Sequence, residues 1–204
     1  LRNYTNEDFD GGFTINSVQD IEGNILPFKI NQTMMRVDLK KALAPGQVFE
    51  FKIDWWYNIN NRMEYGGRSG YETFENDVNK VYTIAQFFPR LCVYNDVEGW
   101  QNFQFWGNGE FALEFGDYEV NITVPSDHIM EATGSLLNPK EVLTRVEYRR
   151  FIDSNSSFDK PILIVNQDEA ILKELSFSKT KSTWRYSAKN VRDFAFASSR
   201  KFIW

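Results

Sequence analysis

Tyr118-Glu-Val-Asn-Ile-Thr-Val-Pro125 is the stretch that decides the fold class, because its apolar and polar residues alternate until a proline ends the run. This period of two is typical of a β-strand that buries one face. A second alternation runs from Phe49 to Tyr57, with Trp56 interrupting its polar face. Shorter apolar alternations of the same kind are found at 26–30, 35–39, 103–105, 111–115, 161–165, 183–188 and 191–197. We therefore predict an all-β protein, an antiparallel β-sandwich with several sheets.

Turn signals between these segments predict how they are connected. Pro45-Gly46 is typical of a tight turn, so we expect 35–39 to form a hairpin with 49–57. Asn108-Gly109 favours a hairpin between the two neighbouring aromatic segments, and Gly116-Asp117 is a further turn candidate. The first half of the chain is thus expected to be a meander.

Two short helices are predicted inside this β pattern. Asn138-Pro139-Lys-Glu141 has a capping residue, a proline at the first helical position and an acidic third residue. Asn166-Gln-Asp-Glu169 repeats the capping pattern, and the polar segment 154–160 between them is expected to be a loop. We therefore predict a small helical insertion around residues 138–175.

Composition excludes several classes of protein. Of the 204 residues, 42% are hydrophobic, which is enough for a buried core, and the net charge of -5 disfavours nucleic acid as a partner. No apolar run approaches the roughly 18 residues that a membrane span needs. The locally basic segment 173–201 is interpreted as a solvated face, with a docking face for a following domain as the alternative.

Few residues could carry catalysis or bind a metal. His128 is the only histidine, so one copy of this chain cannot form a zinc site from two histidines. Cys92, the only cysteine, could pair with His128 as nucleophile and base, but a buried cysteine and a turn histidine explain the same residues. Gly66 to Gly70 lacks the lysine of a phosphate loop and is interpreted as a hairpin loop. We expect no catalytic residue, no metal ligand and no cofactor in this chain.

The corner from Tyr82 to Gln101 is the best candidate for a binding site. Gln86 lies between apolar neighbours, Pro89 interrupts the strand, and the turn formers Asn95, Asp96 and Gly99 follow. Such a corner presents a side chain to something outside the sheet.

Tryptophans provide a second candidate. A sugar-stacking platform could be built from Trp55, Trp56, Trp100 and Trp106. Burial in the core is the ordinary explanation for most of them, and Trp56, on the polar side of its strand, is the best exception.

Several segments, taken in order, resemble the amino-terminal domain of zinc aminopeptidases of the aminopeptidase N family. They are Thr33 to Leu39, Phe51 to Tyr57, Tyr82 to Arg90, Tyr118 to Pro125, Ala132 to Gly134 and Val191 to Ala197. The resemblance covers nearly the whole chain. The Gly66 to Gly70 loop resembles a bacterial branch of larger, multidomain members.

This resemblance implies a role and a missing partner. Residues 1–204 would be a single, saddle-like amino-terminal domain of a longer protein, and a catalytic zinc domain would follow residue 204. Neither the Gly-x-Met-Glu-Asn nor the His-Glu-x-x-His motif of that catalytic domain occurs here. The chain would be noncatalytic and would cap the active-site cleft of a zinc metallopeptidase, and a periplasmic or cell-envelope location is suggested by the resemblance alone.

The resemblance also assigns one site residue. Gln86 matches a family glutamine that helps to hold the free amino group of the peptide substrate. Phe88 departs from the pattern, because many members have Glu or Gln at that position. Two other functions remain open from the residues: a carbohydrate-binding or adhesive sandwich, and a purely structural module that contacts another domain.

Overall fold

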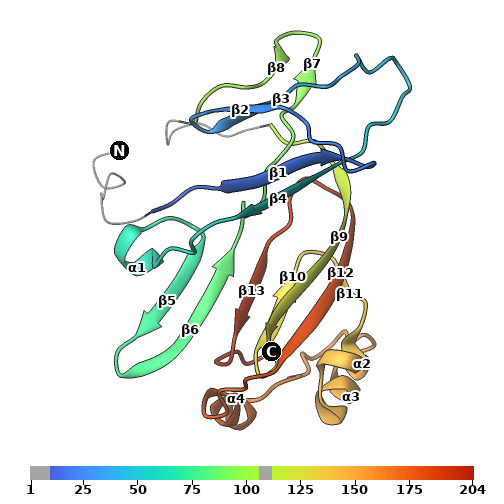
Figure 1. Ribbon diagram of the computed structural model, residues 1–204. Coiled ribbons are helices and arrows are strands. Elements are labelled where there is room, and N and C mark those ends of the chain that lie inside the picture. The colour runs from blue at the N-terminus through green and yellow to red at the C-terminus, as the bar shows by residue number, and fades with distance from the viewer. Residues whose placement is uncertain (1–9, 106–111) are drawn as a thin grey trace. The chain divides into compact units, whose positions relative to one another are not determined.

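The computed structural model describes residues 10–105 and 112–204, which form two compact units (Figure 1). Unit 1 comprises Leu1–Ile59 and Pro89–Leu113, and unit 2 comprises Asn60–Phe88 and Glu114–Trp204. Strands account for 38% of the structure and helices for 14%, and all sheets are antiparallel. The predicted all-β class is confirmed. The prediction of one amino-terminal domain, 1–204, stays a prediction.

Unit 1 contains three two-stranded sheets in the part of the chain that is described. They pair β1 (Thr14–Asp20) with β4 (Phe51–Trp56), β2 (Phe28–Asn31) with β3 (Met34–Val37), and β7 (Tyr94–Asn95) with β8 (Gly99–Trp100). The turn predicted at Pro45-Gly46 is confirmed by a hydrogen bond from Gln47 N to Ala44 O.

The predicted hairpin between 35–39 and 49–57 is wrong. β3 instead follows β2 directly, through a tight turn in which Gln32 has a φ of 53°. β4 pairs with β1, whose register shifts between Ile15 and Ser17. This irregularity interrupts the apolar alternation of β1, so the strand has no clear sequence signal.

Unit 2 is built on two sheets (Figure 1). The four-stranded sheet has the order β10 (Ile129–Ala132), β13 (Phe196–Ser199), β6 (Asp77–Ile84) and β5 (Gly70–Phe74). The three-stranded sheet has the order β11 (Ser135–Leu136), β12 (Lys181–Val191) and β9 (Gly116–Pro125). The strands predicted at 118–125 and 183–188 are therefore confirmed as β9 and β12.

The main core lies between these two sheets. β12 buries Trp184, Tyr186 and Ala188, and β10 buries Met130 in the same cluster. The Tyr186 hydroxyl donates a hydrogen bond to the Met130 carbonyl at 3.0 Å, which joins the sheets through a buried contact. Burying each large side chain contributes about 1.5–3 kcal/mol. Alternate residues of β9 pack half-buried against this cluster, as the sequence pattern predicts.

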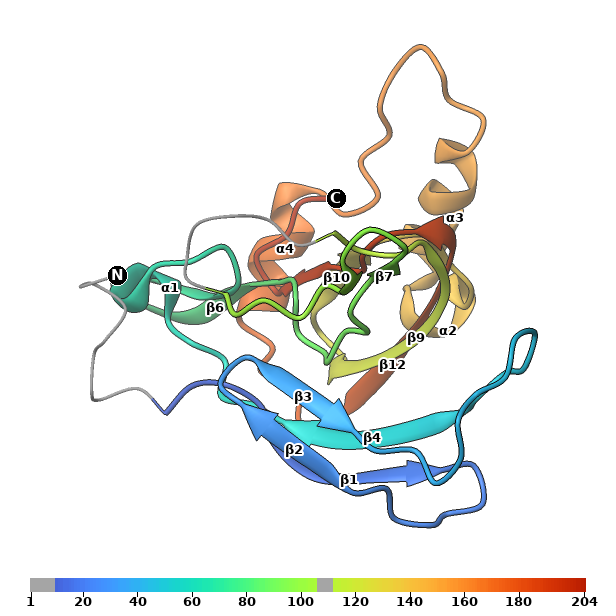
Figure 2. The same ribbon diagram turned by 90° about the horizontal axis from the view of Figure 1, so that it is seen from above.

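Four short helices complete unit 2, and three of them gather at one end of its strands (Figure 1). They are α1 (Arg62–Tyr65), α2 (Pro139–Val142), α3 (Arg145–Ser154) and α4 (Gln167–Glu174). Between α3 and α4, the chain first projects from the strands (Figure 2) and then returns to the core at the buried Ile164 and Val165. The helical insertion predicted around 138–175 is confirmed.

Capping explains the bounds of these helices. Asn166 and Glu169 form the predicted capping box at the start of α4. The predicted first helix is divided in two, because Leu143 is extended and Thr144 begins α3 with a capping box to Glu147. Asn138 makes no side-chain capping bond; its amide instead donates to Thr183 O and accepts from Arg185 N, both at 2.9 Å.

Other predicted strands differ from the structure. Residues 103–105 and 112–115 form no strand, and the turn predicted at 108–109 lies outside the described residues. Gly116-Asp117 is the start of β9 and not a turn. Residues 161–165 are not a strand, although Val165 exchanges backbone hydrogen bonds with Trp204. The segment 191–197 joins the end of β12 to the start of β13.

The glycines at 66–70 do not form the predicted hairpin loop. They connect α1 to β5, whereas the hairpin of β5 and β6 turns at Glu75 and Asn76. Gly70 has a φ of 144°, and a Cβ atom there would lie 2.5 Å from the Asn60 carbonyl oxygen. This position therefore accepts no larger residue without a backbone shift.

Gly134 occupies the corner at which the chain leaves one sheet of unit 2 for the other, between β10 and β11. Its φ is 96°, and an added Cβ would lie 2.3 Å from Ser187 O. We expect Gly134→Ala to lower the free energy of unfolding by more than about 1 kcal/mol, since backbone strain and overlap act together. Urea unfolding followed by circular dichroism measures this loss.

Gly67→Ala is the matched control. Gly67 has a similar φ of 91° but nothing within 4 Å of the added Cβ. The decrease in the free energy of unfolding of Gly67→Ala therefore reports backbone strain without atomic overlap. Equal losses for the two variants would contradict the assignment of Gly134 to a close approach between strands.

Candidate functional site at the Gln86 corner

Gln86 follows the end of β6, at a point where the chain leaves the core of unit 2. Ile84, the last residue of β6, is buried and pairs with Phe196 of β13. The next backbone N–H, that of Ala85, donates to Ser69 Oγ at 3.0 Å. Gln86 itself is exposed. Among the residues the structure describes, its side-chain amide has no hydrogen-bond partner.

Two phenylalanines fix the corner on its other side. The ring of Phe87 lies 5.3 Å from that of Phe196, and the ring of Phe88 lies 5.9 Å from that of Tyr118, both edge to face. Both phenylalanines pack against the main core of unit 2. Because each aromatic pair adds about 0.5–1.5 kcal/mol beyond burial, the chain on both sides of Gln86 is held in place.

The backbone of Gln86 is in the left-handed region, with a φ of 53°. This conformation costs a side chain-bearing residue about 1–2 kcal/mol, and glycine would adopt it without that cost. Gln32 has the same φ in a hairpin turn, so the dihedral angle by itself does not mark a site. Gln86 differs because it connects a buried strand end to two anchored rings.

Phe88, where the resemblance leads us to expect a second polar group, is part of the core packing. The corner therefore offers one amide. An amide oxygen accepts hydrogen bonds and its nitrogen donates two, so Gln86 can bind a polar or cationic group but cannot act as a general base.

The rest of the candidate corner belongs to unit 1. Pro89 begins the second segment of unit 1, and the predicted turn after it is confirmed. There the side chain of Asn95 accepts hydrogen bonds from Val97 N and Glu98 N at 3.2 and 2.8 Å. The stretch 82–101 is thus divided between two units.

Cys92 and His128 each have a local partner. Cys92 is half-buried in unit 1, with its Sγ 3.9 Å from Met34 Sδ. His128 is buried in unit 2, and its Nδ1 lies 2.9 Å from Ser198 Oγ. These surroundings support the interpretation of both residues as structural.

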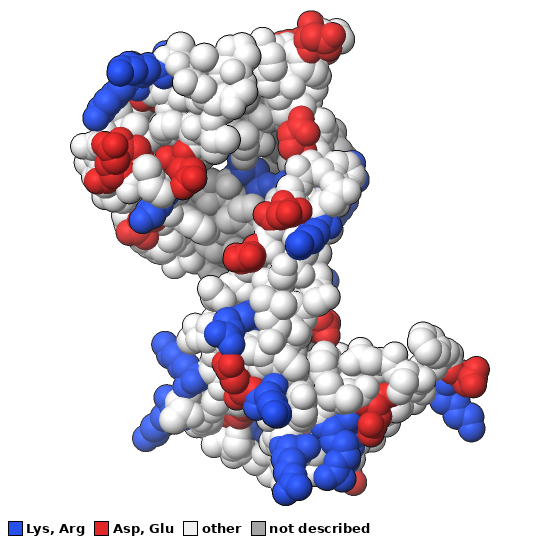
Figure 3. All heavy atoms as spheres, turned by 90° about the vertical axis from the view of Figure 1, so that its right-hand side faces the viewer, with Lys and Arg blue, Asp and Glu red and all other residues white. Residues whose placement is uncertain are grey.

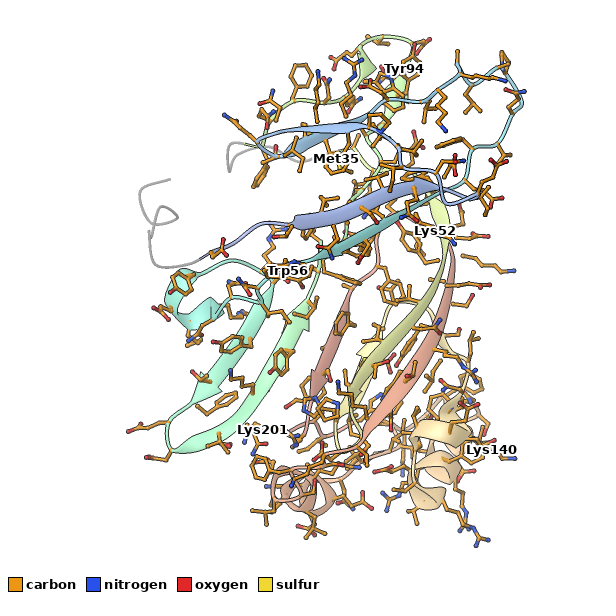
Figure 4. All side chains as sticks on the ribbon, viewed as in Figure 1. Met35, Lys52, Trp56, Tyr94, Lys140 and Lys201 are labelled. Atoms are coloured by element: carbon orange, nitrogen blue, oxygen red, sulfur yellow. The ribbon has the colours of Figure 1, made fainter. Side chains whose placement is uncertain are left out.

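The tryptophans differ in exposure. Trp55 is half-buried, whereas Trp56 on β4 is 47% exposed (Figure 4). Trp100 is 54% exposed, but its ring meets that of Tyr94 edge to face at 5.2 Å, which is not a flat platform. Trp106 lies outside the described residues.

Much of the basic segment 173–201 is paired within unit 2. Lys173 binds Glu147 at 2.9 Å, and Arg185 binds Glu141 at 2.6 Å. Lys201 binds both Asp77 and Glu174 (Figure 4). These pairs favour the interpretation of a solvated face over a docking face.

Metal-ligating side chains do not gather in groups of three or more anywhere in 10–105 or 112–204. Over the same ranges, no helix has the length and apolar character needed to cross a membrane.

Sequence reasoning missed a polar cluster around Asp127. This carboxylate accepts hydrogen bonds from Ser176 Oγ and Ser178 N at 2.7 and 2.6 Å and pairs with Arg200 at 2.8 Å. Burial raises the pKa of Asp127, but Arg200 and the two serine bonds outweigh it and hold the pKa at about 2. The partners are distant in the sequence, so no local pattern connects them.

We expect His128, next to Asp127, to make the stability of unit 2 depend on pH. Burial lowers its pKa to about 4, with a further contribution from Arg200. A depressed histidine pKa favours folding above the unfolded value of about 6.5, and this stability is lost as the pH falls toward 4. We expect the histidine to account for about 2–3 kcal/mol of lost unfolding free energy between pH 7 and pH 4.

His128→Asn provides the measurement, because an amide can keep the Ser198 hydrogen bond without titrating. Urea unfolding at pH 7 and pH 4 should show that the variant loses less unfolding free energy between the two pH values than the unmodified protein. Identical losses in the two proteins would show that His128 does not carry this dependence.

Comparisons of the chain with protein-family models, with curated proteins and with solved structures gave no match.

Proposed function

We propose that this chain is the noncatalytic amino-terminal part of a zinc metallopeptidase of the aminopeptidase type. In this role it caps the active-site cleft, and Gln86 helps to bind the amino terminus of the peptide substrate. Its partner is a catalytic domain of the same polypeptide. That domain supplies the zinc ion, which polarises the peptide carbonyl and activates water.

The observation that carries the proposal is the corner at Gln86. Its amide is exposed while the neighbours on both sides are anchored in the core. This exposed amide at an anchored corner is available for a contact outside unit 2.

The chemistry of one amide limits what this contact does. The Gln86 Oε1 atom can accept a hydrogen bond from a substrate ammonium group, and hydrogen bonds to charged groups contribute about 1.5–3 kcal/mol. With Phe88 in the core, no second acceptor comes from the equivalent position. Recognition of the amino terminus should accordingly be weaker than with two acceptors.

A carbohydrate-binding function is the second candidate, because Trp56 and Trp100 are both about half exposed. Exposed aromatic rings can stack on sugar rings. Quenching of tryptophan fluorescence by glycans, lost in Trp56→Ala, would favour this function over the first.

The test uses the full-length protein and a peptide with a free amino terminus. We expect Gln86→Ala to raise KM about tenfold, the effect of losing about 1.4 kcal/mol of binding, with a smaller change in kcat. The effect should disappear for the N-acetylated peptide. The 204-residue chain by itself should show neither peptide hydrolysis nor stoichiometric zinc.

Gln32→Ala is the matched control, because Gln32 is also an exposed glutamine with a φ of 53°. We expect its kinetics to equal those of the unmodified protein. Peptide turnover by the chain alone, or equal KM values for the two variants, would contradict the proposed function.

A further inference from the structure

Helix α3 presents a basic face that has no partner in unit 2. Arg145 and Arg149 lie one helical turn apart and are both exposed. Residues spaced in this way are neighbours about 5–6 Å apart, so the two like charges repel each other. Lys140 of α2 adds a third cation, with its Nζ 6.0 Å from the centre of the Tyr148 ring (Figure 4).

These three cations contrast with the other basic residues at the helical end of unit 2. Arg150 pairs with Glu169, Lys173 with Glu147, and Arg185 with Glu141, at distances of 2.6 to 2.9 Å. Within the described ranges, no carboxylate forms an ion pair with Lys140, Arg145 or Arg149. Basic side chains gather at the end of unit 2 that carries α2 and α3 (Figure 3).

The basic face carries a shallow, open hollow, and several contacts hold the helix that forms it. A hollow of about 330 Å³ is lined by Arg145, Tyr148, Arg149, Ile152 and Asp153. The helix beneath it is fixed by the capping box at Thr144 and by the buried Glu147, which binds Lys173. Arg150 also donates to the Ile164 carbonyl at 3.1 Å. The hollow is therefore a preorganised surface.

We propose that this hollow binds an acidic segment of another protein. Guanidinium groups pair with carboxylates through two parallel hydrogen bonds. The Tyr148 ring and Ile152, which is 45% exposed, provide an apolar floor beside the two arginines. Arginine and tyrosine beside an aliphatic side chain are the composition of an interface hot spot.

Other anions fit the hollow less well. A nucleic acid needs a wider basic surface for its phosphates, and the net charge of the chain is -5. Binding to an anionic membrane is typical of clusters of about 4–8 basic residues, whereas the basic face consists of Lys140, Arg145 and Arg149. A carboxylate-rich segment with one apolar side chain would pair with the arginines and pack its apolar side chain on the floor of the hollow.

The test is fluorescence anisotropy with a labelled, N-acetylated peptide that has glutamates on both sides of a central leucine. The chain should bind it at least about tenfold more tightly than the same peptide with glutamines. Arg145→Gln with Arg149→Gln should weaken binding about tenfold, and added salt should weaken it further.

Lys179→Gln with Lys189→Gln is the matched control, since it removes the same charge from exposed positions of unit 2. Its affinity should stay within about twofold of the unmodified chain. Equal affinities for the two peptides, or equal losses in the two double variants, would overturn the proposal. Displacement of the peptide by millimolar inorganic phosphate or by phosphatidylserine vesicles would also overturn it, in favour of a phosphate ligand.

Discussion

The buried row Trp184, Tyr186 and Ala188 on β12 is the constraint on which the architecture of unit 2 depends. β12 pairs with β9 on one side and with β11 on the other, so its inward face fixes the whole three-stranded sheet. Tyr186 also reaches the opposite sheet through its hydrogen bond to Met130. A strand that can bury its side chains on one face only sets the register of its neighbours.

The candidate site depends on the same core. Phe87 and Phe88 pack on the cluster to which β12 contributes, whereas Gln86 between them and β6 is exposed. The corner therefore combines a strained backbone with anchored neighbours, as expected where the surrounding structure holds a residue in an unfavourable conformation. Gln86 provides one hydrogen-bonding group and no catalytic one, so any chemistry requires groups that this amide does not supply.

The sequence predicted the features that depend on local patterns. Alternation identified β9 and β12, and the capping box at Asn166 marked the start of α4. Prediction from the sequence failed where contacts between distant residues determine the local structure. The irregular register of β1 removed the alternation that would have identified that strand, and Asn138 binds the backbone of β12 instead of capping a helix. For the site, the exposure of Gln86 was predictable from its position after a strand. The burial of Phe88 against Tyr118 was not, because the two residues are far apart in the sequence.

We conclude that the core of unit 2 holds the Gln86 backbone rigid while leaving its side chain exposed. Backbone ¹⁵N relaxation of the chain in solution measures this most directly. We expect order parameters of about 0.85 for Gln86, Phe87 and Phe88, the value of rigid backbone, and faster motion of the Gln86 side-chain amide. Backbone order parameters below about 0.6 at these residues would show a flexible loop and contradict a rigid Gln86 corner.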